Sequence, residues 1–304
     1  MLNKEVKVIL DLVRMKGNAA RSKIASIVTT TLISGLLVSI PVPAFAAACT
    51  SPTSTIDGAN TVVTFTTVED CDWSVPAGVA SVWVVAVGGG GAAGAGENNR
   101  WWGAGGGGGQ VSSQIISVNS GNTIAVSVGA GGTTGDGSAS SFGSVNANGG
   151  KTPTNLTAVG GVSGSGAAGG TGGAGTTGNG GGGAWKAAVG INAGVGLGSS
   201  ITGTAVEYGG GGNGYNSVGT AGTPRPGAGS YGVAALANRG GGGSQMSTGR
   251  GAGGSGVVII RYSTPVACSP TTSSSGADTI LTFTATGTCA WTPPANVTTF
   301  DLLV

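Results

Sequence analysis

The chain has 304 residues, of which 65 are glycine, 5% are aromatic and 8% carry a charge. Glycine this far above its usual share of about 7% is typical of low-complexity sequence, whereas the positive mean hydropathy, +0.26, argues against a disordered polar chain. The formal net charge is only +2 and there is no histidine, which excludes a strongly basic nucleic-acid-binding protein, Ser-His-Asp catalysis and most zinc sites.

Residues 1–46 have the three parts of a secretory signal peptide. A basic stretch from Lys4 to Lys23 precedes a mostly apolar stretch, Ile24 to Ile40, and Ala44-Phe45-Ala46 supplies a small-residue cleavage site. The apolar stretch approaches the length of a membrane span, but the prolines and small residues after it favour cleavage. Without the leader, seven basic and nine acidic side chains remain, so the mature net charge is −2. We therefore expect a secreted or cell-surface chain with no transmembrane segment after cleavage.

Two strands are predicted after the leader. Residues 59–67 alternate and are rich in β-branched side chains, and residues 80–87 form a nearly continuous apolar run, which is typical of a strand buried on both faces. Between them, residues 71–78 predict a turn in which Trp73 covers one end of the core.

The opening of the domain recurs near the end of the chain. Residues 51–86 align without a gap with residues 269–304 at an offset of 218, and 14 of the 36 pairs are identical. The identical pairs include Cys71 with Cys289 and Trp73 with Trp291. We interpret residues 47–265 as one glycine-rich domain and residues 266–304 as the incomplete start of a second copy, within either a fragment of a longer tandem protein or a truncated gene product.

Four cysteines follow the predicted leader: Cys49, Cys71, Cys268 and Cys289. Four cysteines allow three pairings. Because the repeat carries one pair in each copy, it favours Cys49–Cys71 and Cys268–Cys289. Secretion permits such bridges, and closing a loop of about 22 residues stabilises a fold by about 3 kcal/mol.

All but six of the 65 glycines lie in residues 88–256, a stretch that we call the glycine field. Strand patterns interrupt it at residues 110–118 and 122–128, with a predicted hairpin turn between them, and a short edge-like piece follows at residues 137–143. A strong final strand is predicted at residues 256–262. No segment after the leader shows helical periodicity.

The glycine runs need a special arrangement to be ordered. Ordering a backbone residue costs about 1–2 kcal/mol, and glycine brings no side chain to bury in return. Extended left-handed threads of the polyproline-II type repeat every three residues, and side by side they can exchange backbone N–H···O=C bonds. We therefore expect an all-β fold, a β-sandwich-like framework of strands with an inserted polyglycine-II helix bundle and no α-helix outside the signal peptide.

An ordered series of segments resembles bacterial secreted glycine-rich domains. The segments are residues 76–91, 105–111, 123–132, 140–143 and 254–262. The resemblance covers residues 59–262 and, through the repeat, residues 277–304. This family is similar to the glycine-rich module of anaplastic lymphoma kinase-type receptors, a β-sandwich with polyglycine helices inserted, and to polyglycine-helix phage adhesins, whose loops contact receptors. The resemblance implies a rigid extracellular display scaffold, and it supplies no catalytic residues.

No motif predicts a catalytic residue, a cofactor or a metal site. A phosphate-binding loop fails at Gly149-Gly-Lys-Thr152, because Val145 stands where the first glycine should be. Aromatic side chains in the loops are better candidates for binding, since flat rings suit sugar rings and partner surfaces. The candidate ligand-binding residues are Arg100, Trp101, Trp102, Trp185 and Tyr215, with Tyr208 and Tyr231 in neighbouring loops. The alternative is that these rings pack over the ends of the bundle.

The sequence therefore predicts a secreted or cell-surface, non-enzymatic structural or adhesive domain that displays variable loops on a rigid polyglycine scaffold. The expected partner is a surface glycan or a protein receptor, and no nucleic acid is expected. The alternative is a low-complexity elastic or matrix segment that is largely disordered between its strands.

Overall fold

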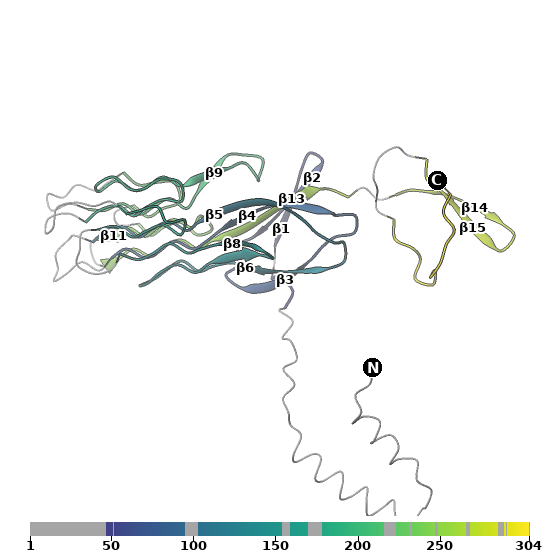
Figure 1. The fold of residues 1–304 in the computed structure, drawn as a ribbon, viewed down its shortest axis with the longest axis horizontal. Coiled ribbons are helices and arrows are strands. Elements are labelled where there is room, and N and C mark those ends of the chain that lie inside the picture. The colour runs from purple at the N-terminus through teal and green to yellow at the C-terminus, as the bar shows by residue number, and fades with distance from the viewer. Residues whose placement is uncertain are drawn as a thin grey trace, which may run out of the picture. The chain divides into compact units, whose positions relative to one another are not determined.

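The computed structural model describes residues 47–303, apart from 51, 95–102, 154–158, 170–177, 216–222, 231–232, 247–248, 266–267, 285–288 and 290. Within these residues the chain is all-β, as predicted, and contains no α-helix (Figure 1). No helix in this part of the chain is long and apolar enough to cross a membrane. The predicted signal peptide lies outside the described residues.

Two antiparallel sheets form the framework of the domain. The five-stranded sheet has the order β1 (Thr53–Asp57), β2 (Asn60–Phe65), β13 (Val257–Ser263), β4 (Ser81–Val87) and β5 (Val111–Ser117). The four-stranded sheet has the order β3 (Asp70–Ser74), β6 (Thr123–Ser127), β7 (Ser140–Phe142) and β8 (Val145–Ala147). Strand β13, although late in the chain, therefore lies between two early strands.

Three short hairpins complete the described secondary structure. They are β9 (Leu197–Ser199) with β10 (Val206–Tyr208), β11 (Gln245–Met246) with β12 (Gly249–Arg250), and β14 (Thr271–Ser275) with β15 (Asp278–Thr282).

The two large sheets face each other across one apolar core. Its larger buried side chains come from both sheets: Val63, Phe65, Trp73, Val82, Val84, Val126, Phe142, Val145, Val258, Ile260 and Tyr262. The Trp73 ring packs in this core, with its centroid 5.6 Å from that of Phe142 and 6.0 Å from that of Tyr262. The predicted turn over residues 71–78 is thus wrong in its first half, where β3 forms. Alternation places Cys71, Trp73 and Val75 in the core, and burial of one face favours a strand.

Strand β4 is buried on both faces, as its continuous apolar run predicts. Val82 and Val84 point into the sandwich core, whereas Val85 and Val87 belong to a second cluster on the outer face of the five-stranded sheet. That outer cluster is covered by Ile201 and Tyr208 from the segment that contains β9 and β10. The central strands of this sheet, β2, β13 and β4, are therefore largely shielded from water on both faces.

A turn is present at residues 119–122, as predicted, but the two strands that it joins, β5 and β6, do not pair with each other as a hairpin would require. The Asn122 N–H donates to the Asn119 carbonyl at 3.1 Å, and Gly121 adopts a φ of +81°, which suits glycine. However, β5 pairs with β4 and β6 pairs with β3, so this turn carries the chain from one sheet to the other. Strand β5 pairs with the buried strand β4 rather than with β6, its neighbour in sequence.

An ion pair fastens the central strand to the edge of the sheet. Arg261 Nη1 of β13 donates to Asp57 Oδ2 of β1 at 2.6 Å and to the Ile201 carbonyl at 3.2 Å. One guanidinium therefore joins β1, β13 and the outer cover of the sheet.

Beyond β4 the backbone of residues 88–94 runs among three other segments of the glycine field. The N–H groups of Gly88, Gly91 and Gly94 donate to the carbonyls of residues 110, 107 and 104. Those of Gly89 and Ala92 donate to residues 138 and 135, and those of Gly90 and Ala93 to residues 254 and 251. Each neighbour is met again after three residues, and its number falls by three each time, so all three neighbours run antiparallel.

Residues 105–110 repeat this pattern with different neighbours. Their consecutive N–H groups donate in turn to residues 179, 243, 151, 182, 240 and 148. The first neighbour is parallel, because its number rises by three, whereas the other two are antiparallel. Figure 1 shows these segments side by side, leading away from the two sheets. The glycine field in its described part is therefore a hydrogen-bonded bundle in which the pattern repeats every three residues.

The spacing of this bundle leaves no room for most side chains. A methyl group on Gly106 would overlap the carbonyl oxygens of Gly91 and Ala92, and one on Gly181 would overlap that of Gly106. Ala92 and Ala93 are fully buried, so the bundle accepts a methyl group at a few positions. Glycine is required here by close backbone approach.

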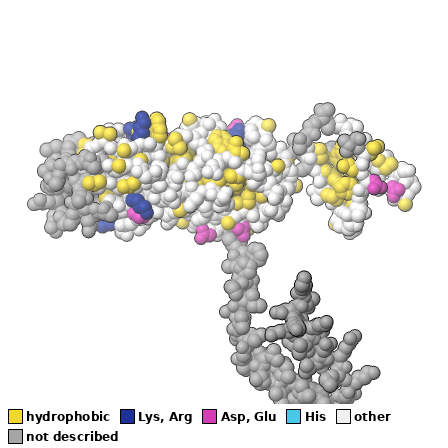
Figure 2. Space-filling model, in the orientation of Figure 1, with side chains coloured by type: hydrophobic (Ala, Val, Ile, Leu, Met, Phe, Trp, Pro, Cys, Tyr) yellow, Lys and Arg dark blue, Asp and Glu magenta, His cyan; other side chains and the backbone are white. Residues whose placement is uncertain are grey.

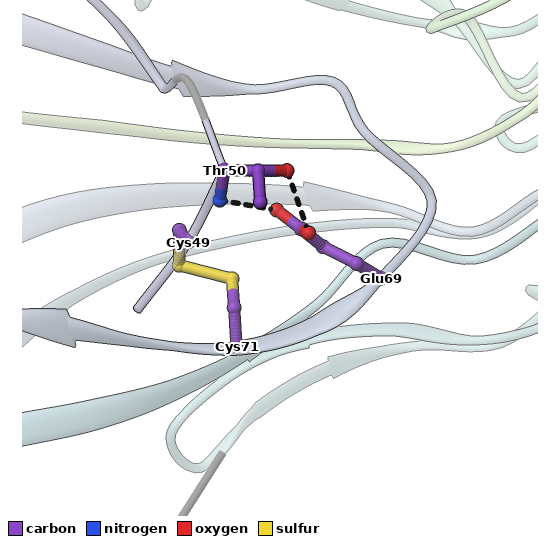
Figure 3. The surroundings of a disulfide bond; sticks show 4 residues. All are labelled: Cys49, Thr50, Glu69 and Cys71. Atoms are coloured by element: carbon purple, nitrogen blue, oxygen red, sulfur yellow. Dashed lines mark hydrogen bonds between the residues drawn. A yellow bond between two sulfur atoms is a disulfide. The ribbon is translucent and has the colours of Figure 1, made fainter. Parts of the chain in front are cut away.

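Both predicted disulfides are present. Cys49 is bonded to Cys71 with 4.7 Å between their Cα atoms, and Cys268 to Cys289 with 5.2 Å. Beside the first bridge, Thr50 donates from its N–H and its hydroxyl to the Glu69 carboxylate, at 2.8 and 2.7 Å (Figure 3). The disulfide and the hydrogen bonds between Thr50 and Glu69 hold the start of the described chain against β3.

We predict that Gly106→Ala destabilises the domain by about 3 kcal/mol, because the methyl group would overlap backbone atoms of Gly91 and Ala92, which cannot move aside as a flexible side chain would. Gly135→Ala is the matched control, since a methyl group there meets nothing within 4 Å. We expect it to change the free energy of unfolding by less than about 1 kcal/mol. Urea denaturation of both variants checks this, and equal effects would contradict close packing at Gly106.

Replacing Cys49 and Cys71 together by alanine is expected to lower the free energy of unfolding by about 3 kcal/mol, because the unfolded chain regains the freedom of a 22-residue loop. The double replacement of Cys268 and Cys289 is the control. It should leave the unfolding of residues 47–265 within about 0.5 kcal/mol of the parent chain, since additivity holds for distant sites. A comparable loss in both variants would show that the two bridges stabilise one cooperative unit.

Candidate functional site

The described residues that flank several loops meet at one end of the glycine bundle. The Gly94 N–H donates to the Ala104 carbonyl, and the Gly178 N–H to the Tyr215 carbonyl, at 2.9 and 2.8 Å. A methyl group on Gly178 would touch the Gly103 carbonyl, and one on Gly103 would touch the Gln245 amide oxygen. We call this group, residues 94, 103, 178, 215 and 245, the loop end of the bundle.

The loop end lies away from the sheets because the chain leaves β4 at residue 88 and enters β5 at residue 111. Residues 88 and 110 are joined by a hydrogen bond, as are residues 94 and 104, so this pair of segments spans the bundle from the sheets to the loop end. At about 3.1 Å per residue, six residues cover roughly 19 Å.

Arg100, Trp101 and Trp102, the main candidates for ligand binding, lie outside the described residues. Their loop starts and finishes at the loop end, because Gly94 and Gly103 are its last described neighbours on either side. The position of the loop's attachment follows from the structure, whereas the placement of its three candidate side chains stays a prediction.

Tyr215 is the candidate that the structure brings to the loop end. It is half-buried, and its carbonyl accepts the hydrogen bond from Gly178. Gly178 adjoins Gly103, which directly follows Trp102 in the chain. Tyr215 therefore lies next to the attachment of the tryptophan loop.

Trp185 lies at the opposite end of the bundle, near the sandwich. The N–H of its neighbour Ala184 donates to the Gly209 carbonyl, which directly follows β10. Its ring is 60% exposed, with the Lys186 ammonium 4.2 Å from the ring centroid. The expected exposure of Trp185 is confirmed, but the structure does not bring this residue together with Tyr215.

Tyr208 is not a loop residue, so its grouping with the exposed aromatics is wrong. It ends β10 and is 4% exposed within the outer cluster of the five-stranded sheet. Burial raises the pKa of its hydroxyl, and the Arg239 guanidinium, 5.5 Å from the ring centroid, opposes this rise. The alternation of apolar residues in a three-residue strand is too short a signal to identify in sequence. Tyr231 lies outside the described residues.

A polar contact that the sequence did not indicate closes the turn at residues 133–136. Lys151 Nζ and the Thr152 N–H donate to the two Asp136 oxygens at 2.9 and 2.8 Å, and Arg250 donates to the Thr134 carbonyl at 2.6 Å. Burial works to raise the pKa of Asp136, but the hydrogen bonds from Thr152 and Lys151 outweigh it and hold this pKa below its ordinary value. We interpret these contacts as structural, because each donor is paired with an acceptor in the turn.

Figure 2 shows that charged side chains are few and widely spaced on the visible face of the described residues. In the described part of the chain, no group of three or more His, Cys, Asp or Glu side chains could hold a metal ion.

Comparison with known proteins agrees with this architecture. A search of the curated proteins finds no match. A family model described as glycine-rich domain matches residues 66–263, from the end of β2 to the end of β13. The matched range contains the whole bundle, the four-stranded sheet and three strands of the five-stranded sheet, and it covers more than half of the chain. The chain therefore belongs to the glycine-rich domain family.

Proposed function

We propose that the mature chain is a secreted or cell-surface, non-enzymatic structural or adhesive domain that displays loops on a rigid polyglycine scaffold. The observation that carries this proposal is the three-residue cycle of hydrogen bonds that joins each glycine segment to three neighbours. A segment held on three sides by its backbone forms a stiff support, and the loops that leave it are held at fixed points.

The segments have the hydrogen-bond period of polyglycine-II helices. Such a helix has three residues per turn and no internal hydrogen bonds, so its successive N–H groups point to three different neighbours. A β-strand has a period of two and would meet one neighbour on each side. The donors at residues 88–94 and 105–110 follow the period of three. This period supports a polyglycine-II bundle inserted in the sandwich.

The loops are the part of this scaffold that can vary. A side chain inside the bundle would overlap a neighbouring backbone, as at Gly106, so variation is confined to residues outside the packed segments. Binding residues are in general concentrated on loops held by a rigid scaffold. The domain can thus change what it binds without changing what holds it together.

The proposed binding surface is the loop end, with Arg100, Trp101 and Trp102 on one loop and Tyr215 beside its attachment. Flat aromatic rings and a guanidinium suit the faces and hydroxyl groups of a surface glycan, or an aromatic-rich patch of a protein receptor. Trp185, near the sandwich, is a separate exposed ring and would make an independent contact.

Secretion is part of the proposal. Two disulfides and no free cysteine among the described residues are compatible with an extracellular chain, since such bridges persist in oxidising compartments. The basic, apolar and small-residue parts of residues 1–46 supply a cleavable leader.

The alternative is an elastic or matrix segment in which only the strands are ordered. Amide hydrogen exchange separates the two. We expect the amides of residues 88–94 and 105–110 to exchange at least about a hundredfold more slowly than in an unfolded chain, because they are buried and hydrogen-bonded. The exchange rates of the Ser113 and Gln114 amides, on the exposed strand β5, are measured in the same sample and compared with those of the glycine segments. A profile at unfolded rates throughout the glycine segments would establish the elastic alternative.

The adhesive role predicts binding on a glycan array that depends on the loop end. Trp101→Ala combined with Trp102→Ala should weaken any glycan signal by about tenfold or more, since each stacked ring contributes roughly 0.5–1.5 kcal/mol beyond its buried area. Trp185→Ala, an exposed tryptophan at the other end of the bundle, is the matched control and should keep the signal. Unchanged binding in the double variant would place the contact elsewhere.

A further inference from the structure

Basic and acidic side chains are divided unevenly between the two parts of the domain. The glycine field, residues 88–256, carries six basic and three acidic side chains, a net charge of +3. Residues 47–87 and 257–265, which frame it, carry one basic and four acidic side chains, a net charge of −3. On the visible face in Figure 2, most Lys and Arg side chains of the domain accordingly lie over the bundle. A charge division of this kind directs anions to the bundle.

Three of these basic residues lie on segments that surround the start of the chain after β10, and we call them the basic group: Lys186, Arg225 and Arg239. The Gly209 N–H donates to the Arg239 carbonyl at 2.8 Å, and the Gly209 carbonyl accepts from Ala184, two residues before Lys186, at 2.7 Å. A methyl group on the next residue, Gly210, would lie 2.7 Å from Arg225 Cβ. Because Gly209 directly follows β10, the basic group lies at the sandwich end of the bundle.

Lys186 and Arg225 flank one short segment of the bundle, residues 193–195. The Lys186 N–H donates to the Val195 carbonyl at 3.1 Å, and Arg225 Nε donates to the Ala193 carbonyl at 3.4 Å. In an extended thread two residues cover about 6 Å. The Arg225 side chain therefore reaches the segment to which Lys186 is bonded, and the two residues are attached to it at neighbouring points.

No ion pair neutralises the basic group within the described residues. The two ion pairs in this part of the chain join Lys151 to Asp136 and Arg261 to Asp57, and neither involves a member of the basic group. The carboxylate of Glu207, on the adjacent strand β10, instead accepts a hydrogen bond from the Gly196 N–H at 2.9 Å.

Neutral partners hold the three cations in place. The Lys186 ammonium lies 4.2 Å from the centroid of the Trp185 ring, and the Arg239 guanidinium lies 5.5 Å from that of Tyr208. Arg225 donates one of its five N–H groups to a carbonyl. An aromatic ring or a carbonyl orients a cation but leaves its net charge uncompensated. Because Lys186 is exposed and both arginines are half-buried, their charges are accessible to an anion.

We propose that the basic group is a second binding site, for a polymer with repeated anionic groups: a glycan that carries carboxylates or a polyol chain that carries phosphates. Guanidinium groups bind both anions with paired N–H donors. The three charges lie on separate segments, so successive units of a chain can contact them in turn, and each contact strengthens the same binding event. The site is at the sandwich end of the bundle, so it does not depend on whether the loop end binds a ligand.

A nucleic acid also carries repeated phosphates, but the charges of this chain favour a less highly charged polymer. Duplex DNA has one negative charge per about 1.7 Å of its axis. The four acidic side chains of residues 47–87 and the net charge of −2 after residue 46 oppose such a ligand.

The experiment titrates the purified chain, with both disulfides formed, with polygalacturonate, a glycerol phosphate polymer, neutral dextran and a DNA duplex, and measures the heat of binding. We expect one or both anionic polymers to bind and dextran not to bind, and the polymer that binds identifies the anion. Three ionic contacts predict that the affinity falls by roughly tenfold between about 50 and 200 mM salt. No binding of either anionic polymer at the lower salt concentration overturns the proposal, as does equal binding of dextran or tighter binding of DNA.

Lys186→Gln combined with Arg225→Gln tests the position of the site. Glutamine keeps the start of the side chain, which packs against Gly210, but removes the charge, so the affinity for the polymer should fall about tenfold or more. Lys151→Gln combined with Arg250→Gln is the matched control, because it removes the same charge beside the turn at residues 133–136. Its affinity should stay within about threefold of the parent, since salt screens distant charges. Cooperative urea unfolding of each variant verifies that it is folded.

A loss of affinity confined to the first pair of substitutions supports the basic group. An equal loss in the control pair overturns it, because the polymer then responds to total charge alone. Trp101→Ala combined with Trp102→Ala should leave polymer binding unchanged. If that variant loses polymer binding, the anionic ligand lies at the loop end, which overturns the second site and leaves the proposed function intact.

Discussion

The close approach of bare backbones in the glycine field is the constraint on which the rest of the structure depends. Gly106 illustrates it: its N–H donates to residue 243, its carbonyl accepts from residue 212, and a methyl group on its Cα would overlap residue 91. Buried backbone donors and acceptors must be paired, and here the pairing runs between segments rather than along a helix or a sheet. Without a Cβ, each segment can satisfy its groups with three neighbours at once. The ordering cost of about 1–2 kcal/mol per residue is offset by backbone bonds instead of buried side chains.

The bundle also determines how the sandwich is completed. Between β8, which ends at Ala147, and β13, which starts at Val257, the chain spends more than a hundred residues mainly in glycine segments and loops. Only after them does β13 enter between β2 and β4, and its Arg261 reach Asp57 on the far edge of the sheet. The central strand of the five-stranded sheet is therefore the last of its strands to be synthesised, and the non-local contacts it makes are of the kind that slow folding. Order within the glycine field brings the two ends of the sheet together.

Elements with a side-chain pattern could be predicted, and elements defined by backbone contacts could not. The apolar run of β4, the final strand β13 and the two disulfides were each visible in sequence, because burial on both faces, β-branched content and a repeated cysteine pair leave a mark on residue type. Strand β3 was mistaken for a turn, since five residues before Pro76 give little periodicity. The partner of each glycine segment had no signal at all, because glycine has no side chain to encode whether residue 105 meets residue 179 or residue 243. The loop attached at Gly94 and Gly103 was identified as a candidate, yet its relation to Tyr215 depends on those unencoded pairings.

The same constraint separates stability from recognition. Inside the bundle a substitution is limited to the few positions, such as Ala92 and Ala93, where a methyl group fits, so the buried segments cannot carry a variable surface. At the loop end, Gly94 and Gly103 attach the loop that carries the candidate residues Trp101 and Trp102, and Gly103 adjoins Gly178, which is bonded to Tyr215. The close packing that orders the glycine segments therefore confines variable side chains to residues outside those segments.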